Sequence, residues 1–196
     1  MAENVLAGNP LADDPALRDS DWLVVNPFAL PLEDAHACAG VLAALSATDV
    51  DDTRLEEWLG IGCDGIYLKG TAERADIQRL DVALSVAEAL SDRAAGAAVI
   101  VAEIATTAQG LLSTASLAGS SERLAALVFD ETEVMRNLGI EAGAPAVAFA
   151  RVHAVLKARQ AGLPVLEVLP LAAPNRDAAL ARSRSEGFDA IAWRLA

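Results

Sequence analysis

The fold class is decided by the stretch Val99-Ile-Val-Ala-Glu-Ile-Ala-Thr-Thr-Ala-Gln-Gly-Leu111. It begins with β-branched and aliphatic residues, which are typical of a buried strand, and continues into a polar cluster where a helix is expected. A second stretch, Leu127-Val-Phe-Asp-Glu-Thr-Glu-Val-Met-Arg-Asn-Leu-Gly139, has the same order. Because α/β proteins place their ligand chemistry at the carboxyl ends of the strands, both polar clusters are candidate sites.

Strands and helices alternate along the chain on both sides of these stretches. The pattern predicts strands at Leu23–Asn26, Gly65–Leu68, Val99–Ile104, Leu124–Phe129, Pro164–Leu169 and Ala190–Trp193. Amphipathic helices are expected at Pro31–Leu45, Glu73–Leu90, Leu111–Ala118, Ala144–Ala161 and Asn175–Ser185. Strand, helix, strand at this spacing predicts right-handed βαβ units, with the four middle strands as consecutive parallel neighbours.

Four segments carry recognisable motifs: Val24–Phe28, Asp64–Lys69, Ala105–Leu111 and Leu127–Gly139. Together, in this order and spacing, they resemble the citrate lyase β-subunit-like family, the HpcH/HpaI aldolase superfamily. In that family the corresponding motifs read close to Arg-Val-Asn-Pro, Asp-Gly-Ile-x-Leu-Pro-Lys, Ile-Glu-Thr-Ala-x-Gly-Leu and Leu-x-Phe-Gly-x-x-Asp-x-x-x-Asp-Leu-Gly. The resemblance implies a (β/α)8 barrel that makes or breaks carbon–carbon bonds beside a Mg²⁺ held by carboxylates.

The chain is short for such a barrel. It has 196 residues, whereas a complete (β/α)8 barrel takes about 200 or more, and only about twenty residues precede Val24. We therefore expect an α/β fold with TIM-barrel-like parallel βα units, in a single domain over 1–196, that forms a shortened or incomplete barrel. The acidic segment at 46–59 is a candidate surface insertion.

At the positions that correspond to the family's site residues, this chain has different residues. The metal-binding Glu corresponds to Thr106, the metal Asp to Glu133, the second Asp to Asn137, and the substrate-binding Arg to Val24. One of two ligand carboxylates is therefore retained, one methylene longer. The candidate metal, Mg²⁺, is expected to bind weakly or not at all.

The candidate site residues fall into two groups. The candidate substrate-binding residues are Asn26, Thr106, Thr107 and Asp130, and the candidate metal ligands are Glu133 and Glu131. Each also has a structural interpretation: the acids suit the first turn of a helix, the threonines suit helix capping, and Asn26 suits a turn.

Glu103 is a further acid next to the first polar cluster. Because strand side chains alternate between faces, we expect Glu103 to face away from Thr106 unless a bulge intervenes. It is therefore not expected to replace the missing ligand.

Two functions remain open. The first is a divergent member of the lyase family with impaired or lost metal-dependent chemistry, acting as a binding or subunit protein. The second is an active carbon–carbon lyase on a small β-hydroxyacyl substrate, with Glu133, Asp130 and Glu131 rebuilding a weak Mg²⁺ site. Under either, the expected ligand is a small carboxylate or an acyl-CoA.

Charge and composition exclude other classes of partner. A net charge of −13 and a pI near 4.4 argue against nucleic acid and anionic membranes, which need basic patches. No apolar run suggests a membrane span. The start of the chain lacks the features of a signal peptide. Cys38 and Cys63 are expected as buried thiols of a reducing compartment, so the protein is expected to be cytoplasmic.

An incomplete barrel would expose two strand edges. Such edges pair readily with another chain. Either the chain pairs with a second copy across the gap, or a helix or loop covers the edges, and we expect a homo-oligomer.

Overall fold

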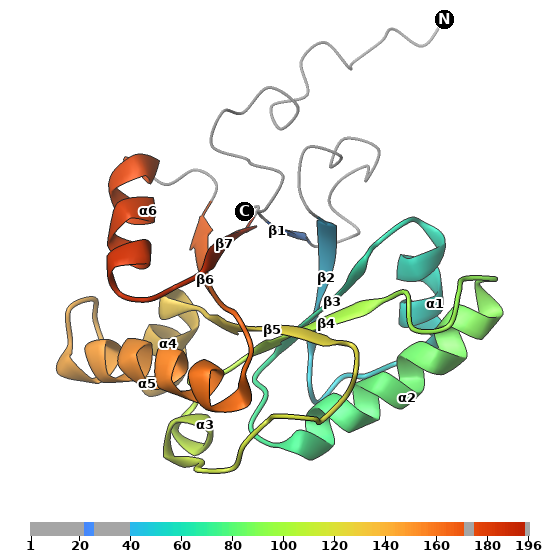
Figure 1. Cartoon of the computed structure of the whole chain (residues 1–196), viewed down its shortest axis with the longest axis horizontal. Helices are drawn as coiled ribbons and strands as arrows, with labels where there is room; N and C mark the ends of the chain where they lie inside the picture. Colours follow the sequence, from blue (N-terminus) through green and yellow to red (C-terminus); the bar gives the residue numbers. More distant parts are fainter. Residues whose placement is uncertain (1–21, 26–39, 171–174, 195–196) are drawn as a thin grey trace, which may run out of the picture.

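The computed structural model describes residues 22–25, 40–170 and 175–194. Within these residues the strands are β1 (Trp22–Val25), β2 (Gly40–Ser46), β3 (Gly65–Lys69), β4 (Val99–Glu103), β5 (Leu124–Phe129), β6 (Val165–Pro170) and β7 (Ala190–Arg194). The helices are α1 (Asp52–Gly60), α2 (Arg74–Leu90), α3 (Ala108–Leu112), α4 (Glu131–Leu138), α5 (Pro145–Ala161) and α6 (Arg176–Ser185). Figure 1 shows the strands at the centre and the helices outside them.

The strands follow one another around a closed barrel, from β1 to β7 in sequence order. Each neighbouring pair is parallel, including β3 with β4, β4 with β5, and β5 with β6. The predicted run of four parallel neighbours is confirmed, as is the shortened TIM-barrel-like fold. The described residues contribute seven strands, one fewer than the eight of a complete barrel.

The expectation of open strand edges is wrong. Strand β1 pairs with β7 as well as with β2, with Leu23 opposite Trp193 on one side and opposite Val41 on the other. This pairing satisfies the backbone groups that an open edge would leave to another chain. The described strands therefore leave no open edge that would need a second chain, and the homo-oligomer stays a prediction.

Strand β2 corrects the expected helix at Pro31–Leu45, whose residues before Gly40 lie outside the described part of the chain. Its sequence, Gly40-Val-Leu-Ala-Ala-Leu-Ser46, is buried on both faces, so it lacks the alternation that would distinguish a strand from a buried helix. Pairing with β1 and β3 makes it a strand. The carboxylate of Asp64 also accepts a hydrogen bond from Val41 N at 2.8 Å.

Helix α3 is shorter and earlier than the expected Leu111–Ala118. It ends at Leu112, where the chain enters a stretch rich in Ser and Thr, whose side chains compete with helical hydrogen bonds. Ser116 Oγ, for example, accepts from Ala118 N at 3.2 Å. Residues 46–59, expected as a candidate surface insertion, contain most of α1, which buries Leu55, Trp58 and Leu59.

Two apolar layers hold the barrel together. The larger lies between the sheet and the helices and includes Leu55, Ile77, Leu84 and Phe129. The smaller cluster takes alternate residues of the strands and fills the barrel interior: Val24, Leu42, Tyr67, Val101, Ala126, Val128, Leu166, Val168 and Ala192. The interior is thus a packed core.

No described helix is long and apolar enough to cross a membrane.

Candidate functional site

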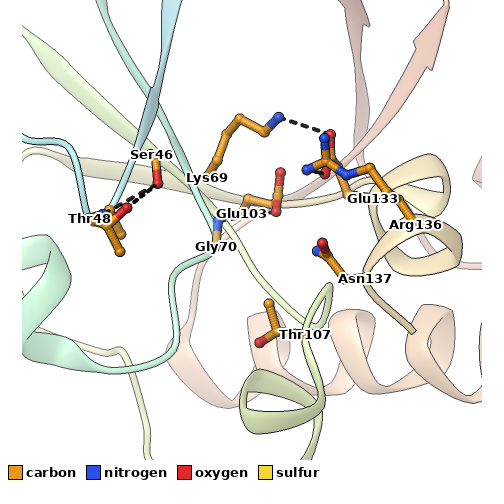
Figure 2. Close-up of a pocket in the computed structure, with 10 residues that line it drawn as sticks. Ser46, Thr48, Lys69, Gly70, Glu103, Thr107, Glu133, Arg136 and Asn137 are labelled. Atoms are coloured by element: carbon orange, nitrogen blue, oxygen red, sulfur yellow. Dashed lines mark hydrogen bonds and ion pairs between the residues drawn. The ribbon is translucent and has the colours of Figure 1, made fainter. Parts of the chain in front are cut away.

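A pocket of about 330 Å³ lies at the carboxyl ends of β2, β3 and β4, beside the first turns of α3 and α4. This is the end of a (β/α) barrel at which active sites are built. Its lining residues are Ser46, Ala47, Thr48, Lys69, Gly70, Glu103, Thr107, Glu133, Arg136 and Asn137. Figure 2 shows their side chains around a common space. We call it the barrel-mouth pocket.

Glu133 is paired with two cations. Lys69 donates from Nζ to Glu133 Oε1 at 2.9 Å, and the guanidinium of Arg136 contacts Oε2. Figure 2 shows both pairs, with Lys69 reaching from β3 toward α4. The side chain of Glu133 is only 7% exposed, so its charge needs such partners. The candidate metal ligand is therefore engaged by an ammonium and a guanidinium.

Glu103 also lines this pocket, which corrects the expectation that it faces away from Thr106. Thr106 Oγ1 donates to Glu103 Oε1 at 2.6 Å, and Gly70 N donates to the same oxygen at 3.1 Å. Simple alternation fails after the strand ends, because Ala105 adopts a left-handed φ of 59° that redirects the chain.

The second oxygen of Glu103 faces the barrel interior. Tyr67 Oη donates to Glu103 Oε2 at 2.6 Å. Burial raises the pKa of Glu103 above its ordinary value, although the Thr106 and Tyr67 hydrogen bonds act in the opposite direction. Burial and the adjacent Glu103 carboxylate likewise raise the pKa of Tyr67. Sequence alternation alone did not predict this buried pair.

Asp130 caps helix α4 and also forms an ion pair. Its Oδ1 accepts from Thr132 N at 2.9 Å and from Glu133 N at 3.3 Å, which satisfies free amides at the helix N-terminus. Its Oδ2 contacts the guanidinium of Arg194, at the end of β7. Burial raises the pKa of Asp130, and Arg194 opposes that shift. Asp130 therefore lies at the helix N-terminus, as its structural interpretation expected, and it occupies the N-cap rather than the first turn.

The two threonines have different roles. Thr107 caps helix α3, with Oγ1 accepting from Gly110 N at 3.0 Å, and its side chain lines the barrel-mouth pocket. Thr106 is buried and is held by Glu103. Asn137 Nδ2 donates to the carbonyl of Thr106 at 3.1 Å, which ties α4 to the end of β4.

Glu131 is not brought to the pocket. Its carboxylate lies 3.0 Å from Arg151, within a network in which Arg151 also pairs with Glu167 and Glu186. Glu167 is fully buried in β6, so this network links β6 to α4 and α5 and is structural. This network could not be predicted from the sequence, because its partners are far apart along the chain.

The motif at Val24–Phe28 is only partly described. Val24 is buried within the barrel interior, in the same cluster as Leu42 and Tyr67. An apolar side chain therefore stands where the resemblance would place an Arg. Asn26 lies outside the described residues.

A Mg²⁺ site would need carboxylate oxygens that are free to bind it. Among the described residues, no three His, Cys, Asp or Glu side chains form a group that could hold a metal ion. Glu133 and Asp130 each have cationic partners, and Glu103 accepts three hydrogen bonds. The donors present therefore do not fit a resident metal.

The fold of this chain is similar to those of several solved proteins at low sequence identity. The chain superimposes on RipC from Yersinia pestis with a TM-score of 0.64 and 20% identity, over 89% of this chain and 88% of that one. An HpcH/HpaI aldolase/citrate lyase family protein from Burkholderia cenocepacia J2315 gives a TM-score of 0.69 at 14% identity, with 97% and 85% of the chains covered. The resemblance read from the motifs is confirmed at the level of the fold.

Malate synthase from Haloferax volcanii has a similar fold. Its complex with pyruvate and acetyl-CoA gives a TM-score of 0.61 at 15% identity, over 90% of this chain and 57% of that one. The present chain thus spans just over half of malate synthase. No protein-family profile matches the sequence, and no curated protein matches it.

Proposed function

We propose that this chain is a divergent citrate lyase β-subunit-like protein of the HpcH/HpaI aldolase family with impaired or lost metal-dependent lyase chemistry. It acts as a binding or subunit protein. One observation carries the proposal: Lys69 Nζ lies 2.9 Å from Glu133, the single acid that the motifs align with a metal ligand. The Lys69 ammonium thus neutralises the Glu133 carboxylate that would otherwise bind a divalent cation.

The surrounding residues support the same function. Thr106, at the position of the second ligand, is a buried hydroxyl that stabilises Glu103. Val24, at the position of the substrate-binding Arg, packs in the apolar interior. A metal-assisted cleavage needs both a cation at the developing enolate and a group that holds the carboxylate or carbonyl. This chain lacks one residue for each requirement: a metal-binding acid at Thr106 and a substrate-binding Arg at Val24.

The proposed ligand of the barrel-mouth pocket is a small carboxylate. Lys69 and Arg136 supply two cationic side chains at its wall, and Asn137 supplies an amide. The hydroxyls of Ser46 and Thr48, 2.8 Å apart, lie on the opposite side. A volume of about 330 Å³ is at the lower end of ligand pockets. It suits a carboxylic acid of a few carbons, and an acyl-CoA would leave most of its length outside.

A second candidate function is an active lyase with a rebuilt, weak Mg²⁺ site. The observation that favours it is electrostatic: burial raises the pKa of Glu103 and of Asp130, with a smaller contribution from Asp130 to the first shift and from Glu133 to the second. Glu103 and Glu133 line the barrel-mouth pocket, and Asp130 lies close enough to interact with both, although the three do not form a group that could hold a metal ion. A divalent ion would have to displace Lys69 to reach Glu133, which makes tight binding unfavourable.

Calorimetric titration with malonate or pyruvate, in the absence and presence of Mg²⁺, separates the two functions. The binding function predicts carboxylate binding that is independent of Mg²⁺ and weakened in Lys69→Met and Arg136→Met. Binding that requires Mg²⁺, together with cleavage of citryl or malyl thioesters that Glu133→Ala abolishes, would establish the lyase. A cytoplasmic location and a homo-oligomer are part of the proposal and are checked by fractionation and light scattering.

A further inference from the structure

A second pocket lies on the outside of the barrel, between α3 and α5. Its volume is about 480 Å³, and it shares no lining residue with the barrel-mouth pocket. We call it the α3–α5 groove. It plays no part in the function proposed above.

Lys157 is a buried cation in this groove. Lys157 is 5% exposed. Its Nζ donates one hydrogen bond, to the carbonyl of Ser113 at 3.3 Å. An ammonium has three donors, and buried charges in proteins are normally paired. No carboxylate in the described part of the chain forms an ion pair with Lys157, although the protein carries a net charge of −13.

His153 lies one helical turn before Lys157 on the same groove wall. Its Nδ1 is buried and has no hydrogen-bond partner among the described residues. Burial and the ammonium of Lys157 lower its pKa, so the imidazole is neutral at pH 7 and can donate from one ring nitrogen. The groove floor thus offers two polar groups to an oxygen acceptor.

The rim of the groove is apolar and open to solvent. Leu112, Phe149 and Leu156 are 80%, 57% and 63% exposed. Phe149 stacks on His153 with ring centroids 5.9 Å apart, so the rim continues directly into the polar floor. Contiguous exposed apolar side chains commonly mark binding surfaces.

We propose that the α3–α5 groove binds an aliphatic monocarboxylate. The carboxylate pairs with Lys157 and accepts from His153, and the hydrocarbon chain lies along Leu112, Phe149 and Leu156. Charge complementarity selects this ligand, because a buried ammonium without an acid attracts an anion and the apolar rim disfavours a polar tail. Sulfate and short polyanions would satisfy the ammonium and leave the rim exposed.

The test uses octanoate and its neutral isostere octanamide, titrated into the full chain and followed by calorimetry. We expect octanoate to bind about tenfold or more tightly than octanamide, since a charge-assisted pair at a buried site is worth that factor. Lys157→Met should abolish this preference. Leu156→Ser should weaken both ligands, and Val82→Ser, on the exposed face of α2, should change neither.

Equal affinity for octanoate and octanamide, or an unchanged preference in Lys157→Met, would overturn the proposal. Circular dichroism checks whether Lys157→Met is folded. The Leu156→Ser variant, changed at an exposed position, tests the groove even if Lys157→Met does not fold. If light scattering instead shows an oligomer that Leu156→Ser dissociates and octanoate leaves intact, the groove is an interface between copies and the carboxylate site is rejected.

Discussion

Lys69 and Glu133 are 64 positions apart, yet Lys69 Nζ donates to Glu133 Oε1 at 2.9 Å across the barrel-mouth pocket. Lys69 ends strand β3 and Glu133 lies in the first turn of α4. The pair brings together two βα units that strand β4 separates. It places a fixed positive charge at the acid that would otherwise be available to a metal ion.

Removing that charge should strengthen metal binding. We expect Lys69→Met to raise Mn²⁺ affinity by about tenfold, because a neighbouring ammonium worth about 1.4 kcal/mol no longer competes for Glu133. Titration calorimetry measures it. Arg159→Met is the matched control, since it removes an ion-paired cation far from the pocket. Equal gains in the two variants would show a general charge effect.

Rebuilding the ligand set should restore a metal site. The double variant Thr106→Glu and Glu133→Asp supplies the two acids of the resembling motifs, and we expect it to bind Mg²⁺ more tightly than the wild type if the strand ends keep their geometry. Thr106 is buried against Glu103, so the added acid meets a second carboxylate there. Adding Lys69→Met should increase the gain. Failure of the triple variant, while folded, would refute the alignment of these positions.

Stability at low pH should depend on Glu88. This carboxylate is 1% exposed and lies 2.6 Å from Arg123. Hydrogen bonds from Arg123, Ala98 and Gly96 outweigh burial and lower the pKa of Glu88 from 4.5 to about 2. A lowered folded pKa contributes stability above pH 4.5 that is lost as the pH falls toward 2, here about 3 kcal/mol.

Urea denaturation at pH 7, 4 and 2.5 checks this dependence. The stability difference between wild type and Glu88→Gln should shrink as the pH falls. Glu57→Gln, on the exposed face of α1, is the control and should show little change at any pH. A difference that does not vary with pH would contradict the assignment.

Gly65 should be intolerant of any side chain. A Cβ built there would lie 2.2 Å from the carbonyl oxygen of Val99 in the neighbouring strand. Gly65→Ala should therefore destabilise the fold by about 1–3 kcal/mol, as overpacking does. Gly60→Ala, whose Cβ meets nothing within 4 Å at the end of α1, should be neutral or stabilising. Denaturation midpoints compare the two.

Much of the fold could be predicted from local pattern. Runs of β-branched or aliphatic residues predicted β3, β4, β5 and β6, and the helices expected between them predicted parallel pairing. Strand β2 was missed because Ala and Leu on both faces carry no period. Closure by β1 and β7 depends on pairing between the ends of the chain, which composition does not reveal.

The candidate site was predicted less completely. Glu133 and Thr107, both predicted site residues, line one pocket. The capping role of Thr107 and the place of Asp130 at a helix N-terminus followed from residue type, whereas Thr106, also expected to cap, is bonded to Glu103. Glu103 was assigned to the wrong face because the left-handed residue Ala105 breaks the alternation. The ion pairs of Lys69 and Arg136 with Glu133, and of Arg194 with Asp130, were not predicted. Such pairs form only once the barrel closes.

Calorimetric titration of the wild-type chain with Mg²⁺ and Mn²⁺, paired with a cleavage assay on citryl and malyl thioesters, tests the central claim most directly. The expected result is weak or no metal binding and no cleavage at enzymatic rates, because loss of a ligand and of an oxyanion-stabilising group each costs on the order of 10² or more. Tight binding of either ion, with cleavage that Glu133→Ala abolishes, would contradict it.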